Sequence, residues 1–357
     1  MTNGMGLKTK GLGVGSWDGR NSNNGEWKEE DLSGMELTFI PNHPSINLAR
    51  ITKLDLSRNN LQVISESAMA RLVNVVSLDL HSNQMKSLPN SIGCLSKLKR
   101  LDASSNLLES LPTTIQACRS VEELLVHFNE LTELPDKMGL GLTNLRLLSV
   151  HSNKLAFLPA TTHRLAALRS LDAHLNCLVA LPEDLHLLPF LHSVDVSQNF
   201  HHLRSLPDTV GLLPSLSHLH IAHNSIAALP DSLACAASLR TLRADGNPLS
   251  SPPLDLVLAG GADAVRDYLI RRMSHRPRDA GRGKASWIQR LAKCGPFSGK
   301  IEGRDHEADG LVMTSEYNSF DSGVATPGRR YAGVLSPLRI FSRQKSVPPT
   351  STSLAWK

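Results

Sequence analysis

One pattern of leucines and asparagines recurs along most of this chain, and it limits the possible folds more than any other feature. The pattern is L-x-x-L-x-L-x-x-N-x-L, as in ITKLDLSRNNL at residues 51–61. A degenerate copy precedes it at residues 31–37, with Met35 at the asparagine position. The asparagines recur at intervals of 23 to 25 residues: Asn59, Asn83, Asn106, Asn129, Asn153, Asn176, Asn199, Asn224 and Asn247. Such a period indicates an array in which one small structural unit stacks on the next.

Each unit should begin with a short strand that ends near its asparagine. The L-x-L alternation turns leucines such as Leu54 and Leu56 toward a core and the residues between them toward solvent. Where the chain leaves the strand, the asparagine amide can pair backbone groups that would otherwise be buried without partners, at about 1–3 kcal/mol per group. We therefore expect the nine asparagines to form a structural ladder along the array.

The second half of each unit holds a proline followed by apolar residues at 3-10 or α-helical spacing, as in SLPNSIGCLSKL. These prolines are Pro89, Pro112, Pro135, Pro159, Pro182, Pro207 and Pro230. Together the two halves predict an α/β repeat fold, a leucine-rich-repeat solenoid (horseshoe) of about ten units of 23–24 residues. Short parallel strands should line its concave face, and 3-10 or helical segments its convex side.

The places where the pattern begins and ends predict four segments. Residues 1–30 and 274–357 are rich in glycine, serine, proline and charge without a period, so we expect a disordered leader and a mostly disordered tail. Residues 31–250 form the repeat array. Residues 251–273 should form a helical C-terminal cap, because they carry an apolar stripe: Leu254, Leu256, Val257, Leu258, Ala264, Val265, Tyr268 and Leu269.

The formal net charge of +5 belongs to the tail, which carries 14 basic and 7 acidic residues. The array has no basic surface pattern that would predict nucleic-acid binding. In the tail, Trp287, Ile288 and Leu291 lie near basic residues and fit either chance composition or a weak membrane-surface helix. Thr326 and Ser336 precede prolines and could accept phosphate.

One outward column of the strands is acidic at both ends and apolar in the middle. Its acidic members include Asp79, Asp102, Asp172 and Asp195, and the apolar break holds Leu125, Phe128, Leu147 and Leu175. Exposed apolar side chains among charges are typical of the centre of a protein interface. The aspartates would then favour a basic partner. The alternative is an ordinary surface without a partner, and the extended turn at residues 200–205 is either a tolerated insertion or a binding loop.

Catalytic motifs are missing from the sequence, which predicts a protein that is no enzyme and uses no cofactor. Gly11, Gly13 and Gly15 follow no strand, as a phosphate-binding loop would require. His127, His151 and His174 share one register in consecutive units and should stack near the inter-strand spacing. They fit either a solvated ladder of polar residues, which we favour and which predicts no metal, or a shared metal ion.

The scattered cysteines and the lack of a signal or membrane segment favour a reducing compartment. Five cysteines are present, and none lies in a CxxC pair. No apolar run is long enough to cross a bilayer, and the first residues contain no secretory core segment. We expect an intracellular, most simply cytoplasmic, location.

The segments on either side of the repeats add a family resemblance. The lead-in DLSGMELTFIP, the return segments SLPNSI and ALPEDL, and the ending GADAVRDYLIRRM resemble plant intracellular Ras-group-related leucine-rich-repeat proteins. The resemblance implies an intracellular scaffold or adaptor that binds protein partners, in signal transduction linked to small GTPases. The alternatives are a regulatory subunit in a phosphatase or GTPase pathway, or an adaptor that reaches membrane surfaces through its tail.

Overall fold

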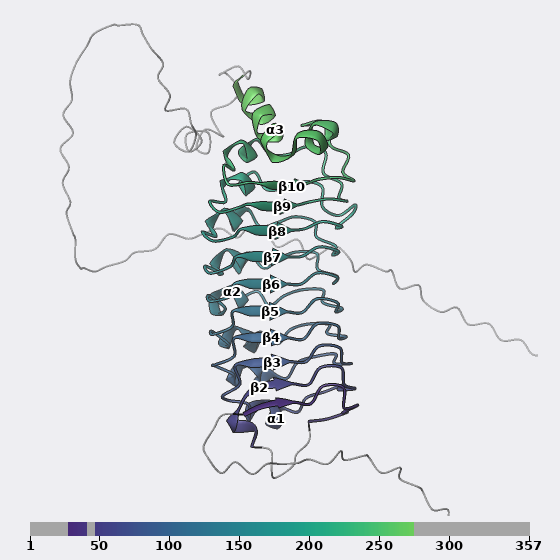
Figure 1. Ribbon diagram of the computed structural model, residues 1–357, viewed down its shortest axis with the longest axis vertical. Coiled ribbons are helices and arrows are strands. Elements are labelled where there is room, and N and C mark those ends of the chain that lie inside the picture. Colours follow the sequence, from purple (N-terminus) through teal and green to yellow (C-terminus); the bar gives the residue numbers. More distant parts are fainter. Residues whose placement is uncertain (1–27, 41–46, 275–357) are drawn as a thin grey trace, which may run out of the picture. The chain divides into compact units, whose positions relative to one another are not determined.

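The computed structural model describes residues 28–40 and 47–274 of the chain. Within these ranges, ten strands form one sheet in which spatial order equals chain order (Figure 1). All neighbouring strands are parallel, and equivalent residues face each other, so that Leu78 lies between Leu54 and Leu101. The strands are β1 (Lys28–Asp31), β2 (Ile51–Asp55), β3 (Ser77–Asp79), β4 (Arg100–Asp102), β5 (Glu123–Leu125), β6 (Leu147–Ser149), β7 (Ser170–Asp172), β8 (Ser193–Asp195), β9 (His218–His220) and β10 (Thr241–Arg243). The predicted solenoid of stacked parallel strands is confirmed.

The strands are short because every unit turns at the same place. The residue before each ladder asparagine has a left-handed backbone, for example φ 53° at Ser105 and φ 51° at Phe128. An L-residue in this conformation costs about 1–2 kcal/mol, so tertiary contacts must impose it. The left-handed residue bends the chain out of the strand, and backbone carbonyl groups of the turn then face the asparagine side chain.

Buried side-chain amides satisfy those carbonyls. The Asn106 side chain shows the arrangement: its Nδ2 donates to Leu80 O at 3.0 Å, Ala103 O at 3.2 Å and Ser104 O at 3.1 Å. Its Oδ1 accepts from Met85 N, in the preceding unit, at 3.0 Å. Asparagines at the other eight positions are also buried and bond in the same manner within and between units.

Short helices form the other side of each unit, which was predicted as convex. They are η1 (Leu48–Arg50), α1 (Glu66–Ala70), η2 (Asn90–Cys94), η3 (Thr113–Ala117), α2 (Met138–Gly141), η4 (Ala160–Arg164), η5 (Glu183–Leu187), η6 (Val210–Leu212) and η7 (Asp231–Cys235). A proline immediately precedes five of them, as Pro89 does for η2. Bonds of the 3-10 type, such as Leu95 N to Ile92 O at 3.0 Å, then turn Ile92 and Leu95 into the core.

The N-terminal end of the array differs from the predicted boundary. Strand β1 begins at Lys28, three residues before the expected start of the array, because Lys28–Asp31 pair with β2 despite their polar sequence. The next residue, Leu32, is buried and continues the leucine pattern. Asn59 Nδ2 donates to Leu32 O. Because Met35 follows Leu32 by three residues, as each ladder asparagine follows the last inward-facing residue of its strand pattern, Met35 occupies the asparagine position of the first unit.

A helix covers the C-terminal end of the array. Helix α3 (Leu254–Ser274) changes direction at Gly261, whose φ is 59°, and buries Val257, Val265 and Leu269. The prediction that Leu258 belongs to the buried stripe is wrong, since 59% of this residue is exposed. The remaining parts of the predicted leader and tail, 1–27 and 275–357, lie outside the described residues, as do the tail helix and the phosphate-accepting positions.

The two extra residues of the eighth unit lie in its turn. The Leu203 side chain is fully buried and takes the place of the leucine that follows the asparagine in other units. The insertion itself exposes Phe200, with φ 47°, while His202 N donates back to Asn199 O at 3.0 Å. The added residues thus leave the register of the array unchanged.

Candidate partner-binding surface

Three histidine rings stack on the solvent-facing side of β5, β6 and β7, the side that we call the concave face. The ring centroids of His127 and His151 are 4.4 Å apart, and those of His151 and His174 are 4.3 Å apart. The rings are nearly parallel, with interplanar angles of 16° and 13°. We call these three residues the histidine stack. Their close spacing follows from equal positions on strands that lie about 4.8 Å apart.

Two exposed apolar side chains border the histidine stack. Phe128 is 54% exposed and meets the His151 ring edge-on at a centroid distance of 5.0 Å. Leu175 is 38% exposed and occupies the equivalent place two units later. Both residues have a φ of 51°, in the left-handed turn where other units carry serine at Ser82, Ser105 and Ser152. Bulky side chains that conflict with the local backbone geometry are features typical of functional surfaces.

The other two apolar residues predicted for this patch do not stand open to solvent. Only 9% of Leu125 is exposed, and Leu147 is half-buried. Leu125 lies on the sheet between Asp102 and Ser149, and the latter hydroxyl lies 3.2 Å from Nδ1 of His127. The His127 side chain thus lies over this position of the sheet and covers Leu125. The exposed patch therefore consists of Phe128, Leu175 and the histidine rings.

The aspartate column has a structural role that the sequence pattern did not reveal. The Oδ1 atom of each accepts a bond from the backbone N two residues later, at 3.0 Å for Asp79, 3.1 Å for Asp102, 3.3 Å for Asp172 and 3.0 Å for Asp195. These bonds close the turn that follows the strand. The recurring D-x-S/H spacing is the signal that could have predicted it.

Burial separates Asp102 from the other three aspartates. Asp102 is only 7% exposed and also bonds Ser104 Oγ at 2.6 Å and Arg100 Nη2 at 3.2 Å. The expectation that it belongs to an exposed acidic surround is therefore wrong. The side chains of Asp79, Asp172 and Asp195 remain 24–30% exposed. They lie on both sides of the exposed patch along the sheet.

Burial favours the uncharged form of two rings of the histidine stack, His127 and His151. Burial, together with the nearby His127 and His174, lowers the pKa of His151 to about 4 against the attraction of Asp172 and Asp195. Burial also lowers the pKa of His127. At neutral pH the patch accordingly presents the uncharged rings of His127 and His151 between carboxylates.

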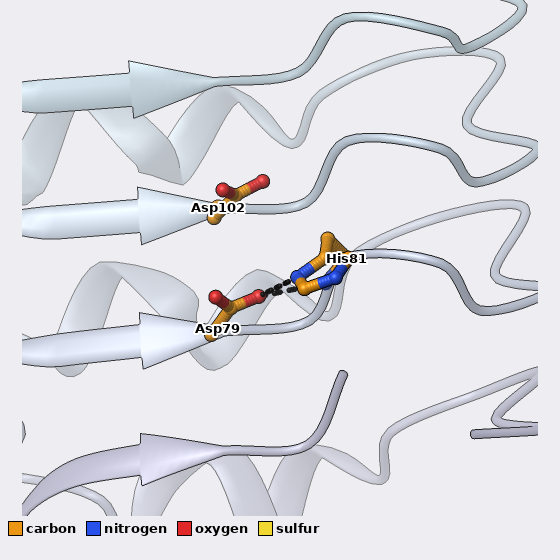
Figure 2. Close-up of side chains that lie close together, drawn as sticks. All are labelled: Asp79, His81 and Asp102. Atoms are coloured by element: carbon orange, nitrogen blue, oxygen red, sulfur yellow. Dashed lines mark hydrogen bonds and ion pairs between the residues drawn. The ribbon is translucent and has the colours of Figure 1, made fainter. Parts of the chain in front are cut away.

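Stacking argues against one metal ion shared by these three histidines. An imidazole binds a metal ion in the plane of its ring, and nearly parallel planes more than 4 Å apart have no common point for one ion. Two other groups bring ligand atoms of three residues within 4.8 Å of one another. One is Asp79, His81 and Asp102, in which His81 Nδ1 lies 2.7 Å from Asp79 Oδ1 (Figure 2). The other is Asp172, His174 and Asp195.

Among the cysteines of the described segments, Cys94, Cys118 and Cys177 are free thiols. Burial raises the pKa of Cys118 to about 12, so that thiol is a packing residue without nucleophilic character. In the part of the chain that the structure covers, no helix combines the length and the apolar character needed to cross a membrane.

Comparisons with known proteins agree with this architecture. The leucine-rich-repeat family model matches residues 31–108 and 119–178. The solved structure of YopM, a leucine-rich effector protein from Yersinia pestis, is similar with a TM-score of 0.51 and 27% identity, over 63% of this chain and 57% of that one.

Two relatives match nearly the whole sequence. Plant intracellular Ras-group-related LRR protein 1 of Oryza sativa subsp. japonica is 51% identical, and the match covers 96% of both chains. Plant intracellular Ras-group-related LRR protein 8 of Arabidopsis thaliana is 50% identical over 88% of this chain and 82% of its own length. The chain therefore belongs to the plant intracellular Ras-group-related leucine-rich-repeat family.

Proposed function

We propose that this protein is a non-catalytic scaffold or adaptor that binds a protein partner on its concave face. The observation that carries the proposal is the pair of exposed apolar side chains, Phe128 and Leu175, beside the histidine stack. Leucine-rich-repeat proteins use such faces to bind other proteins. An apolar, aromatic centre that loses water on binding supplies most of the affinity in a typical interface.

The charges around this centre favour a partner with basic side chains. Asp79 lies on one side of it, and Asp172 and Asp195 lie on the other, each partly exposed. A basic partner would be attracted along the whole face and then fixed by the apolar centre. The family name supports a role in signalling linked to small GTPases, and the word intracellular in the names of the relatives supports a cytoplasmic location.

Affinity capture from plant cell extract, read by quantitative mass spectrometry, tests the proposal. The test variant carries Phe128→Ser and Leu175→Ser, because serine is the residue found in this turn in other units. A matched control carries Leu187→Ser and Phe190→Ser, which remove side chains that are 55% and 52% exposed within and just after η5. We expect partners to be lost from the test variant and kept by the control.

Purified plant small GTPases, loaded with GDP or with a GTP analogue, provide the second arm of the experiment. Binding that weakens at least about tenfold in the test variant alone would support the GTPase-linked function. Identical partner sets for the native chain and the test variant would refute the concave-face site.

A further inference from the structure

Two carboxylates and two imidazoles meet on the concave face near the C-terminal end of the array. Asp172 and His174 come from β7 and its turn, Asp195 from β8 and His220 from β9. Ligand atoms of the first three lie within 4.8 Å of one another, and His220 Nδ1 lies 3.2 Å from Asp195 Oδ2. The four side chains are between 25% and 30% exposed, so an ion can reach them from solvent.

Hydrogen bonds hold these carboxylates in fixed orientations. Asp195 Oδ1 accepts from both the backbone N and the hydroxyl of Ser197, at 3.0 Å and 2.6 Å. Its Oδ2 atom is thereby directed toward His220. Asp172 Oδ1 accepts from His174 N and also lies 2.7 Å from Nδ1 of that ring. Such outer bonds orient the ligands of protein metal sites before the ion arrives.

The other cluster, Asp79, His81 and Asp102, repeats the same D-x-H…D arrangement four units earlier (Figure 2). There, the Arg100 guanidinium lies 3.2 Å from Asp102 Oδ2 and supplies the positive charge. Register provides the second difference, because Asp102 is paired with Leu125 whereas Asp195 is paired with His220. The earlier cluster thus has a cation already in place and lacks the histidine that contacts the second aspartate in the later one.

At the later cluster, neutral serines replace the arginine of the earlier one. Ser170 and Ser193 precede Leu171 and Val194 at the register position that Arg100 occupies on β4. The two carboxylates of Asp172 and Asp195 supply two negative charges, which match one divalent cation. Mixed nitrogen and oxygen donors suit Zn²⁺ and similar transition metals better than Ca²⁺ or Mg²⁺, which prefer oxygen alone.

We propose that Asp172, His174 and Asp195 bind one divalent transition-metal ion, of the class of Zn²⁺, and that His220 orients the Asp195 carboxylate. Each of the three ligands contributes one atom, and the units of β7 and β8 supply them. The site shares His174 with the exposed patch, and Asp172 and Asp195 with the charges around it, but it rests on the donor set and not on Phe128 and Leu175.

Zn²⁺ titration of the full-length chain against a chromophoric indicator tests the site. The key variant is His220→Leu, which introduces the residue found at this register in the earlier cluster. We expect the native chain to bind one more equivalent of Zn²⁺ than this variant, or to bind it at least about tenfold more tightly. His81→Ser, in the earlier cluster, is the matched control and should bind as the native chain does.

A second variant and a spectrum protect the test against misfolding and against cysteine ligands. Asp172→Asn keeps the oxygen that accepts from His174 N and removes the charge, so it should fold and still lose the equivalent. Co²⁺ bound here should give d–d bands without thiolate charge transfer. Equal Zn²⁺ binding by the native chain, His220→Leu and Asp172→Asn would overturn the proposal. So would loss of the bound Zn²⁺ equivalent in His81→Ser, or a thiolate charge-transfer band for the bound Co²⁺.

Discussion

Single asparagines determine whether each unit can close its turn. Asn106 makes four bonds to backbone groups, and replacement by alanine leaves the buried Met85 N–H without this partner and removes one donor from each of three carbonyls. We expect Asn106→Ala to lower the free energy of unfolding by about 2–5 kcal/mol. Urea unfolding followed by circular dichroism measures this loss.

Asn60, the residue directly after the ladder asparagine Asn59, provides the control. Asn60 accepts one exposed bond, from Gln84 Nε2 at 3.3 Å, so Asn60→Ala should change the free energy of unfolding by less than about 0.5 kcal/mol. Equal effects of the two substitutions would contradict the structural role of the ladder.

At the scale of elements, the histidine stack makes stability depend on pH. Burial holds the pKa of His151 at about 4, whereas in the unfolded chain the group returns to about 6.5. Between these values the unfolded chain binds a proton that the folded chain does not. The free energy of unfolding should therefore fall as pH decreases from about 6.5 to 4, and the contribution should level off below that.

Serine is the matched replacement, because Ser57, Ser104 and Ser197 occupy this position in other units. Urea unfolding of the native chain and of His151→Ser at a series of pH values isolates the contribution of this one ring. We expect the difference between the two chains to change by about 1–2 kcal/mol over the interval, less than the full shift implies because the ring is partly exposed. A difference that is constant with pH would show that the stack does not exclude protons.

At the scale of the whole molecule, each repeat unit is stabilised by packing against its neighbours, and α3 packs against the last unit. Leu269 is fully buried, and the Arg272 side chain donates from Nε to Asp231 Oδ1, in η7, at 2.9 Å. Leu269→Ala should cost about 2–5 kcal/mol locally. Because stability in such arrays is a sum of nearest-neighbour terms, hydrogen exchange should speed up in β10 and β9 and stay unchanged in β4 and β5. Uniform acceleration along all strands would contradict this account.

The repeated sequence pattern made the fold predictable. The candidate site was less predictable, because it depends on side chains that differ from unit to unit. Nine copies of one pattern define which leucines face inward, where strands end and where helices follow. Strand β1 has no leucine in KEED, so pairing with β2 could not be predicted from the pattern. The burial of Leu125 and Asp102 depends on side chains of adjacent units, which a pattern within one unit does not describe. The turn bonds of the aspartates were equally hidden, although exposed Phe128 and Leu175 were correctly placed outward.

The central claim is that the concave face is where this protein meets its partner. The most direct test is a photo-reactive benzoylphenylalanine placed at Ser152, which lies in register between Phe128 and Leu175. The same group at Leu187, in η5, serves as the control. After irradiation in plant cells, the account predicts covalent adducts with partner proteins from position 152 and not from position 187. Adducts from position 187 alone would move the binding surface to the other side of the solenoid and contradict the account.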